Sequence, residues 1–335
     1  MYLDFYGLKE NPFTLVTEPR FLYYSESHCE AMAHLLYGVR ERKGIIAMFG
    51  EAGTGKTTLI RATLGLLRQS RVVPSVILNP MVASAEELLD AVLHGFGITA
   101  RGKSSLEKAE VLQQFAMQET RGGRIVVILV DEAQELSRHV LEQLRLLSNL
   151  EDQNEKLLQI VLSAQPEFRD KLEDHDFRAM RQRITVRCRL HALNAQETWR
   201  YLYHRLAIAG GKTEIFTPDA VEGLYAYSTG IPRILNSLAD NCLLAGFSRG
   251  FPQVTGAVVE QVAKHLELQA PTAMLRESDS IHKDIMRASA TWKEVVADIR
   301  GGDVPAALRA FVEKLQVQDR GNAPLTTAMR RGAQV

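Results

Sequence analysis

Residues Gly50 to Thr58 read Gly-Glu-Ala-Gly-Thr-Gly-Lys-Thr-Thr, which satisfies the G-x-x-x-x-G-K-S/T pattern of a phosphate-binding loop. The loop follows a short apolar run, residues 44–49, and precedes a segment, residues 57–67, whose apolar side chains repeat at helical spacing. Glycines let several main-chain N–H groups point at one anion, and a helix N-terminus favours negative charge. We therefore expect a bound nucleotide to contact every residue of the loop, namely Gly50, Glu51, Ala52, Gly53, Thr54, Gly55, Lys56, Thr57 and Thr58.

Two carboxylates after another apolar run are the expected companion of this loop. Residues 125–130 are apolar throughout and end in Asp131 and Glu132. Lys56 is expected to reach the β- and γ-phosphates, while Thr57 and Asp131 are expected to hold Mg²⁺, the latter largely through water. Glu132 would polarise the attacking water as a general base, which hydrolysis requires and simple binding does not. The pattern predicts an ATP hydrolase, because the guanine-reading sequence N-K-x-D does not occur in the chain.

Polar residues outside these motifs are candidates for further contacts with the reacting phosphate. Ser163 follows the apolar run 158–162 and could sense the γ-phosphate through a hydrogen bond, with Gln165 as the second choice. Arg183, and after it Arg181, could stabilise transition-state charge in a neighbouring subunit. Arg233 follows Gly-Ile-Pro at a predicted helix start and is expected to reach the nucleotide from the C-terminal helical region. Each also has a plainer interpretation, as a loop-opening polar residue or a solvated surface charge.

Alternating strands and helices in the first part of the chain predict a parallel α/β sheet. The predicted strands cover residues 44–49, 71–79, 125–130, 158–162 and 184–190. We therefore expect residues 1–190 to form an αβα sandwich around a five-stranded parallel sheet, the fold of P-loop NTPases. Only helical patterns follow, so residues 191–270 are expected to form a small helical lid domain. A linker over 271–280, C-terminal helices over 281–318 and a disordered tail over 319–335 complete the predicted organisation.

Aromatic residues crowd the part of the chain that precedes the phosphate-binding loop. Phe13, in the sequence Asn-Pro-Phe, is a candidate for contact with an adenine ring. The alternative is that these aromatic residues cover the end of the sheet. The sequence does not decide between the two interpretations.

The composition is that of an ordinary globular protein, with 46% hydrophobic and 24% charged residues in a chain of 335. Its 40 basic residues balance 40 acidic ones, which argues against a protein that binds bulk polyanions but leaves room for a local basic patch. Cys29, Cys188 and Cys242 are far apart and form no C-x-x-C pair, as expected in a reducing compartment. The N-terminus lacks the features of a signal peptide, and no stretch reaches the ~18 apolar residues of a membrane span, so a cytoplasmic location is expected.

Together these segments resemble the AAA+ ATPases, and more narrowly the GspA/ExeA-type ATPase family of bacteria. The resemblance covers roughly residues 1–270 and includes several elements besides the phosphate-binding loop. They are Phe5-Tyr-Gly-Leu-Lys-Glu-Asn-Pro-Phe13, Phe21-Leu-Tyr-Tyr-Ser25 with His28, Leu129-Val-Asp-Glu-Ala-Gln134, Ala164-Gln-Pro-Glu167, Arg181-Gln-Arg183 and Gly230-Ile-Pro-Arg233.

The resemblance implies an αβα core with a helical lid, ATP and Mg²⁺ as cofactors, and self-assembly that places Arg183 or Arg181 in a neighbour's site. It also implies sensor roles for Ser163 and Arg233. ExeA-type proteins continue into a membrane span and a periplasmic peptidoglycan-binding region that help assemble a secretion channel, whereas this sequence has neither. The chain therefore resembles a soluble branch of the family, whose members occur beside pilus and exopolysaccharide or exosortase systems.

Three uses of ATP fit the resemblance. The first is a motor or switch for a protein partner in an envelope-associated system, docked through the C-terminal helices, where Trp292 belongs to an apolar stripe. The second is a DNA-binding transposition regulator that forms rings or filaments, since the core is also similar to that of the TnsC, TniB and MuB proteins. Arg61, Arg68 and Arg71, or the arginines between 178 and 189, would then line a channel for DNA. The third is a signalling switch that binds ATP and barely hydrolyses it.

Overall fold

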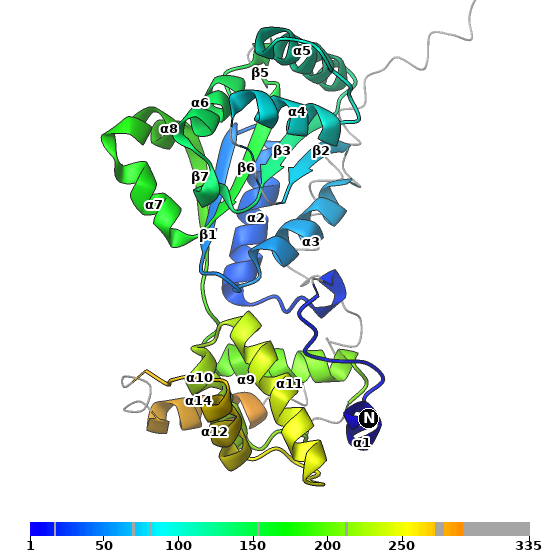
Figure 1. The fold of residues 1–335 in the computed structure, drawn as a ribbon, viewed down its shortest axis with the longest axis vertical. Coiled ribbons are helices and arrows are strands. Elements are labelled where there is room, and N and C mark those ends of the chain that lie inside the picture. Colours follow the sequence, from blue (N-terminus) through cyan, green and yellow to red (C-terminus); the bar gives the residue numbers. More distant parts are fainter. Residues whose placement is uncertain are drawn as a thin grey trace, which may run out of the picture.

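The computed structural model describes residues 1–16, 18–68, 71–78, 80, 82, 84–152, 155–211, 214–271 and 278–290. Trp292, the second predicted C-terminal helix and the predicted tail over 319–335 lie outside the described residues. Figure 1 shows two lobes, a sheet flanked by helices at the top and a group of helices below it. Within the described ranges, no helix combines the length and the apolar character that crossing a membrane requires.

A parallel sheet with the strand order β2-β3-β6-β1-β7 forms the centre of the upper lobe. Its strands are β1 (Ile45–Gly50), β2 (Val72–Ile77), β3 (Ile125–Val130), β6 (Leu158–Ala164) and β7 (Ile184–Leu190). The side chains of β1 and β6 are buried throughout, because helices cover both faces of the sheet. The edge strand β7 alternates buried and exposed residues instead. The predicted fold class, with five parallel strands, is therefore confirmed.

The helices of this lobe form two layers, one on each face of the sheet (Figure 1). One face carries α2 (Glu26–Arg40) and α3 (Lys56–Arg68), whose apolar residues share a core with alternate residues of the central strands. The other face carries α4 (Ala85–Gly95), α5 (Ser105–Arg121), α6 (Arg138–Leu147), α7 (Pro166–Glu173) and α8 (Arg178–Arg183). Since successive side chains of a strand point to opposite faces, each central strand contributes to both cores.

Several short elements have no counterpart among the predicted ones. Besides α1 (Tyr2–Tyr6), α7 and α8 they are the hairpin strands β4 (Glu151–Asp152) and β5 (Glu155–Lys156) and the 3-10 helices η1 (Pro19–Phe21), η2 (Ala133–Glu135) and η3 (His175–Phe177). Elements of two or three residues bury too little apolar surface to leave a periodic pattern in the sequence. One of them matters for the site, because η2 begins directly after the paired carboxylates at the end of β3.

The lower lobe is a bundle of helices and forms the lid of the predicted fold. It contains α9 (Ala195–Ile208), α10 (Pro218–Ser228), α11 (Pro232–Ser248) and α12 (Gly256–His265). A capping box of Asn194 and Glu197 starts α9. Prolines stand in the first turns of α10 and α11, where the missing N–H would have had no helical partner.

A further helix, α14 (Ser278–Ala290), packs against the lid. It begins within the residues predicted to form a linker, 271–280, and its Ile281 and Ile285 are buried in the lid core. The apolar repeat that predicted the start of a separate C-terminal appendage at residue 281 is therefore the buried face of a lid helix. This is a correction to the expected organisation, and it arises because an amphipathic pattern does not reveal which surface covers it.

The N-terminal segment runs along the lid before the chain enters the upper lobe (Figure 1). It starts with α1 (Tyr2–Tyr6), and Tyr6, Leu8 and Phe13 are buried in the lid core. Phe13 is 1% exposed, and its ring lies edge-on against Phe216 with 6.0 Å between the ring centroids. Both interpretations of Phe13 are therefore wrong, because its ring fills an apolar gap within the lid and faces neither a nucleotide cavity nor the sheet.

Candidate functional site

A cavity with a volume of about 230 Å³ lies between the two lobes, at the edge of the sheet where β1 and β3 end. Ligands bind at this edge of parallel α/β sheets, because the loops that follow the strands converge there. The phosphate-binding loop, the N-terminal segment and the lid all line the cavity. The predicted site residues that line it are Gly53, Thr54, Gly55, Lys56, Thr57, Thr58, Glu132 and Arg233. Gly50 and Glu51 line a smaller cavity beside the loop instead, and Ala52 is exposed.

The loop connects β1 to α3 and holds the Lys56 side chain against its own main chain. The Lys56 ammonium donates to the carbonyl oxygens of Gly50 at 2.7 Å and Glu51 at 3.1 Å, and the residue is 5% exposed. Burial lowers the pKa of Lys56, while the nearby carboxylates of Glu132 and Asp131 act in the opposite direction. A phosphate group beside the ammonium would supply the charge pairing that this buried cation needs.

Thr57 and Asp131, the residues predicted to hold Mg²⁺, are in direct contact. The Thr57 hydroxyl donates to the Asp131 carboxylate at 2.5 Å, although 74 positions separate the two residues. Asp131 is 1% exposed, and its other oxygen accepts a hydrogen bond from the Glu132 amide at 3.0 Å. A hydroxyl and a carboxylate are hard oxygen donors, and Mg²⁺ in phosphate sites takes only one or two such groups from the protein. The donor set therefore fits Mg²⁺ held together with a nucleotide.

Glu132 has an unusual main-chain conformation directly after β3. Its φ of +52° lies in the left-handed region, which non-glycine residues keep mainly where the surrounding structure enforces it, often at functional sites. Its carboxylate accepts hydrogen bonds from the side-chain amides of Gln134 at 2.6 Å and Gln165 at 3.2 Å. Burial alone would raise the pKa of Glu132, but these bonds and the charges of Lys56 and Arg233 together lower it. The side chain is therefore a carboxylate at neutral pH, as a general base must be.

The structure reverses the order of preference for Ser163 and Gln165, since Gln165 contacts the candidate base and Ser163 does not line the cavity. Ser163 lies within β6 beside Met48 of β1, is fully buried and does not line the cavity. Its hydroxyl has no hydrogen-bond partner within the described part of the chain. Gln165 follows the strand and contacts Glu132, while its main-chain amide donates to the Gln134 side chain at 3.0 Å. Gln134 and Gln165 thus orient the candidate base, and their sequence signal is their place just after two neighbouring strands.

The lid touches the phosphate-binding loop directly, through Arg233 in the first turn of α11. The Arg233 amide donates to the carbonyl oxygen of Gly53 at 3.2 Å. Gly53 has a φ of +83°, and a Cβ atom added there would lie 2.6 Å from the Cβ atom of Arg233. Only glycine therefore allows the lid to approach the loop this closely.

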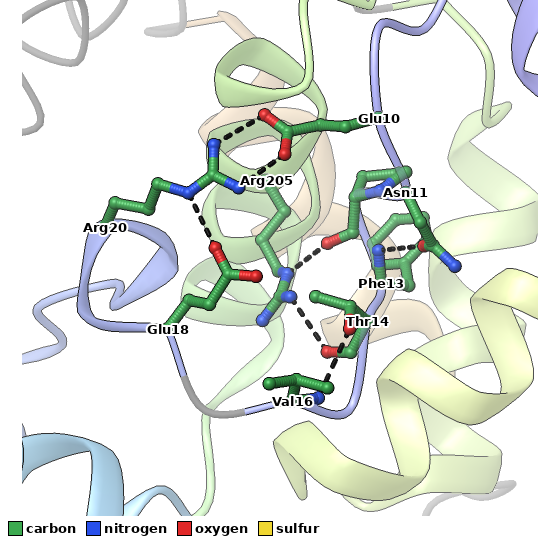
Figure 2. A network of polar contacts seen from close by, with 9 residues as sticks. Glu10, Asn11, Phe13, Thr14, Val16, Glu18, Arg20 and Arg205 are labelled. Atoms are coloured by element: carbon green, nitrogen blue, oxygen red, sulfur yellow. Dashed lines mark hydrogen bonds and ion pairs between the residues drawn. The ribbon is translucent and has the colours of Figure 1, made fainter.

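The N-terminal segment contributes a wall of the cavity that sequence reasoning missed. Thr14, Leu15 and Val16 line it, and the two apolar side chains are 61% and 68% exposed at its mouth. Figure 2 shows how Arg205 of α9 holds this wall: the guanidinium donates to the carbonyl oxygens of Pro12 and Thr14, the latter at 3.1 Å. Arg205 is 7% exposed, and its position within the apolar face of a lid helix is the only signal the sequence offers.

Arg181 and Arg183 lie away from the cavity, at the opposite edge of the sheet. They end α8 directly before β7, whose first residue is paired with the first residue of β1. The phosphate-binding loop begins at the last residue of β1, so the length of that strand, about 20 Å, separates the loop from the two arginines. Arg183 is exposed, and Arg181 forms an ion pair with Glu173. Neither arginine can reach the nucleotide site of its own chain in this geometry.

Comparison with known proteins places the chain among AAA proteins. Residues 39–172 match the model of a family described as an AAA domain. The general secretion pathway protein A of Aeromonas hydrophila is 41% identical over 251 residues, which are 75% of this chain and 46% of that protein. The chain thus spans about half the length of the curated relative that it matches.

Solved structures share the arrangement of core and lid. The ORC2 protein of Aeropyrum pernix, in ADPNP–ADP complexes, is similar with a TM-score of 0.59 at 15% identity, over 80% of this chain and 74% of that one. Drosophila ORC bound to DNA is similar with a TM-score of 0.59 at 16% identity, over 92% of this chain and 81% of that one. These two matches show the fold alone. The AAA domain match and the 41% identical relative agree with the site's geometry: the chain contains an AAA domain and is related to general secretion pathway protein A.

Proposed function

We propose that the chain binds ATP with Mg²⁺ in the cavity between the lobes and hydrolyses the ATP. The contact between Thr57 and Asp131, with Glu132 beside it, supports this most directly. It brings the phosphate-binding loop and the tip of β3 into the arrangement that a nucleotide with a divalent cation requires. The match to an AAA domain and the nucleotide complexes of the A. pernix ORC2 protein agree with the proposal.

The residues of the site would each have a separate role in the reaction. Loop N–H groups and Lys56 would bind the phosphates, while Thr57 and Asp131 would hold Mg²⁺. When bound, Mg²⁺ supplies positive charge that neutralises the phosphate oxygens. The Glu132 carboxylate would accept a proton from the water that attacks the γ-phosphorus, with Gln165 fixing the orientation of that carboxylate.

The proposed active form is a homo-oligomer, a ring or a filament. Arg183, or else Arg181, is too far from the loop of its own chain and would instead reach the γ-phosphate of a neighbouring subunit. Arg233 would reach the same phosphate group from the lid, so a site built by two subunits would hydrolyse ATP only after assembly. Sedimentation with and without a slowly hydrolysed ATP analogue tests this, and a monomer under both conditions would contradict it.

The proposed use of hydrolysis is to act as a motor or switch for a protein partner in an envelope-associated system. The relative that is 41% identical is named general secretion pathway protein A, which supports this choice. The partner would dock through the C-terminal helices, on residues after α14. We place the chain in the cytoplasm, where a reducing environment suits the free thiols of Cys29, Cys188 and Cys242.

A second candidate function is ATP-dependent binding to DNA, and a basic surface favours it. Arg187 and Arg189 lie on the exposed side of the edge strand β7 and, together with Arg169, line a cavity there. Drosophila ORC, whose structure contains DNA, shares the fold. A gel shift of duplex DNA that needs the ATP analogue and weakens steeply with salt would support this function. No shift at low salt would exclude it.

Glu132→Gln tests the proposed hydrolysis. The change removes the carboxylate and keeps its size, so ATP binding should persist while phosphate release falls by about 100-fold or more. The matched control is Glu135→Gln, since Glu135 is an exposed carboxylate in the same turn, and it should retain the wild-type rate. Equal phosphate release from the wild type and the Glu132 variant would refute the base, and a wild type that does not bind ATP would refute the site.

A further inference from the structure

The first turn of α2 lies beneath the phosphate-binding loop and contains a buried serine–histidine pair. The Ser25 hydroxyl caps the helix by accepting the His28 amide at 3.4 Å, and it also lies 2.6 Å from Nδ1 of the His28 ring. Ser25 and His28 are 2% and 3% exposed. His28 borders the same cavity as the loop, although none of the chemistry described above uses it.

The other ring nitrogen of His28 faces the loop. A Cβ atom added to Gly55 would lie 3.1 Å from Nε2, so the ring is in contact with the loop's main chain. Burial lowers the pKa of His28 to about 4, and a main-chain hydrogen bond with Thr54 acts in the opposite direction. A bond that favours the protonated ring must be donated by the ring, so its acceptor is the carbonyl oxygen of Thr54.

On its other side, the same turn reaches the connector between β7 and the lid. The hydroxyls of Ser27 and Ser25 lie 3.2 Å apart, and the Ser27 hydroxyl accepts a hydrogen bond from the His191 amide at 3.3 Å. The Glu26 amide donates to the Glu197 carboxylate of α9 at 3.2 Å. The turn is therefore bonded to the core–lid connector and to the first lid helix at once.

Donor and acceptor roles follow one direction along this path. One assignment of the hydroxyl and imidazole protons satisfies every group along this path: the His191 amide donates to Ser27, Ser27 to Ser25, Ser25 to Nδ1 of His28, and Nε2–H of His28 to Thr54. A neutral imidazole satisfies both of its bonds in this arrangement, because one ring nitrogen accepts while the other donates. No group along the path has to be charged.

We propose that His28 is a positioning residue for the phosphate-binding loop and that it links the conformation of the loop to that of the lid. In a trans peptide the C=O and N–H groups point in opposite directions. Anchoring the Thr54 carbonyl on His28 therefore aims the N–H of Gly55 away from the histidine, as an anion-binding donor of the loop. The inference rests on the proposed binding of ATP, since it assigns to His28 the orientation of a phosphate-binding N–H group.

Substitutions of His28 test the positioning role by calorimetric titration with a slowly hydrolysed ATP analogue and Mg²⁺. His28→Leu keeps an apolar side chain in the buried site and should weaken binding by about tenfold, the equivalent of one hydrogen bond. His28→Gln places an amide N–H near the position of Nε2 and should restore most of that loss. His28→Asn is shorter, reaches only the position of Nδ1 and should not. His34→Leu, on the same helix, is the matched control.

The outcomes separate this inference from the proposed function. A wild type that does not bind the analogue would overturn both. Equal affinity of the wild type and His28→Leu would overturn the inference alone. Equal losses in His28→Leu and His28→Gln would also overturn it, because a role in packing would not distinguish an amide that donates at Nε2 from a side chain that donates nothing.

Ser27→Ala tests the link to the lid, because it interrupts the path on the lid side of Ser25. Affinity for the analogue should stay within about twofold of the wild type. Hydrogen exchange should show that the analogue protects the amides of α9 in the wild type and protects them much less in the variant. Equal protection in both proteins would overturn the link to the lid, and a loss of affinity like that of His28→Leu would show that the two roles cannot be separated as proposed.

Discussion

The two walls of the cavity are built in different ways. The core wall takes its groups from two short motifs, residues 50–58 and 131–132, which directly follow the buried strands β1 and β3. The lid wall joins the N-terminal segment to α9 and α11 through a buried relay, in which Arg205 donates to the Tyr201 hydroxyl at 3.0 Å and Tyr201 donates to Asn236 at 2.8 Å. The core wall is therefore built from local sequence and contains the groups of the proposed chemistry, whereas the lid wall exists only when distant segments pack.

Breaking the core wall at Lys56 should have the largest effect on ligand binding. Lys56→Ala removes the buried ammonium, and a charge-assisted hydrogen bond is worth up to about 3 kcal/mol, which corresponds to roughly 100-fold in affinity for ATP. Calorimetric titration with ATP and Mg²⁺ measures the change. Lys103→Ala, which removes an exposed cation of the same lobe, is the control. Wild-type affinity in Lys56→Ala would mean that the nucleotide binds elsewhere.

Breaking the lid wall at Arg205 should reduce stability rather than chemistry. Arg205→Leu leaves the carbonyl oxygens of Pro12 and Thr14 and the Tyr201 hydroxyl without their donor, at a cost of about 3 kcal/mol in the free energy of unfolding. Urea titration measures this cost. Arg20→Leu removes ion pairs with Glu10 and Glu18 (Figure 2) and a contact with the Phe21 ring, all made by a largely exposed side chain, and should change stability little. Similar losses in both variants would contradict the role of Arg205.

The contrast between local motifs in the core wall and distant contacts in the lid wall also explains how much of the molecule could be predicted from the sequence. The fold class and the contact between Thr57 and Asp131 follow from motifs that stand next to their own strands. Arg205 could not be predicted, because its partner Pro12 is 193 positions away and Arg205 itself belongs to no motif. Phe13 was assigned to the wrong place because an aromatic residue has the same sequence signature whether it fills a core or faces a ligand.

The packing of α14 on the lid offers a smaller and more local test. Ile285→Ala should lower the free energy of unfolding by about 2 to 3 kcal/mol, because Ile285 is fully buried in the lid core. Met286→Ala changes the next residue, which is 46% exposed, and should have little effect. Thermal unfolding of both variants measures the difference. If the two changes were equivalent, α14 would not belong to the lid core.

Each lobe also contains a buried histidine, so the two walls can be compared through the loss of stability at acid pH. His28 in the core and His204 in the lid both have a pKa lowered from 6.5 to about 4 by burial. In the unfolded chain both imidazole rings are exposed to water and bind protons below about pH 6.5. The unfolded state therefore binds more protons between pH 6.5 and pH 4, and stability should be lost as the pH falls through this range.

His204→Leu should remove part of this acid sensitivity, on the order of 1 kcal/mol in the free energy of unfolding at pH 5. The quantity to compare is the slope of that free energy with pH, because the substitution also changes the packing against the Tyr23 ring and shifts stability at every pH. His265→Leu, on the exposed side of α12, is the control. A wild-type slope in His204→Leu would mean that the lid histidine is already protonated in the folded protein. Of the two buried histidines, only His28 would then contribute to the loss of stability between pH 6.5 and pH 4.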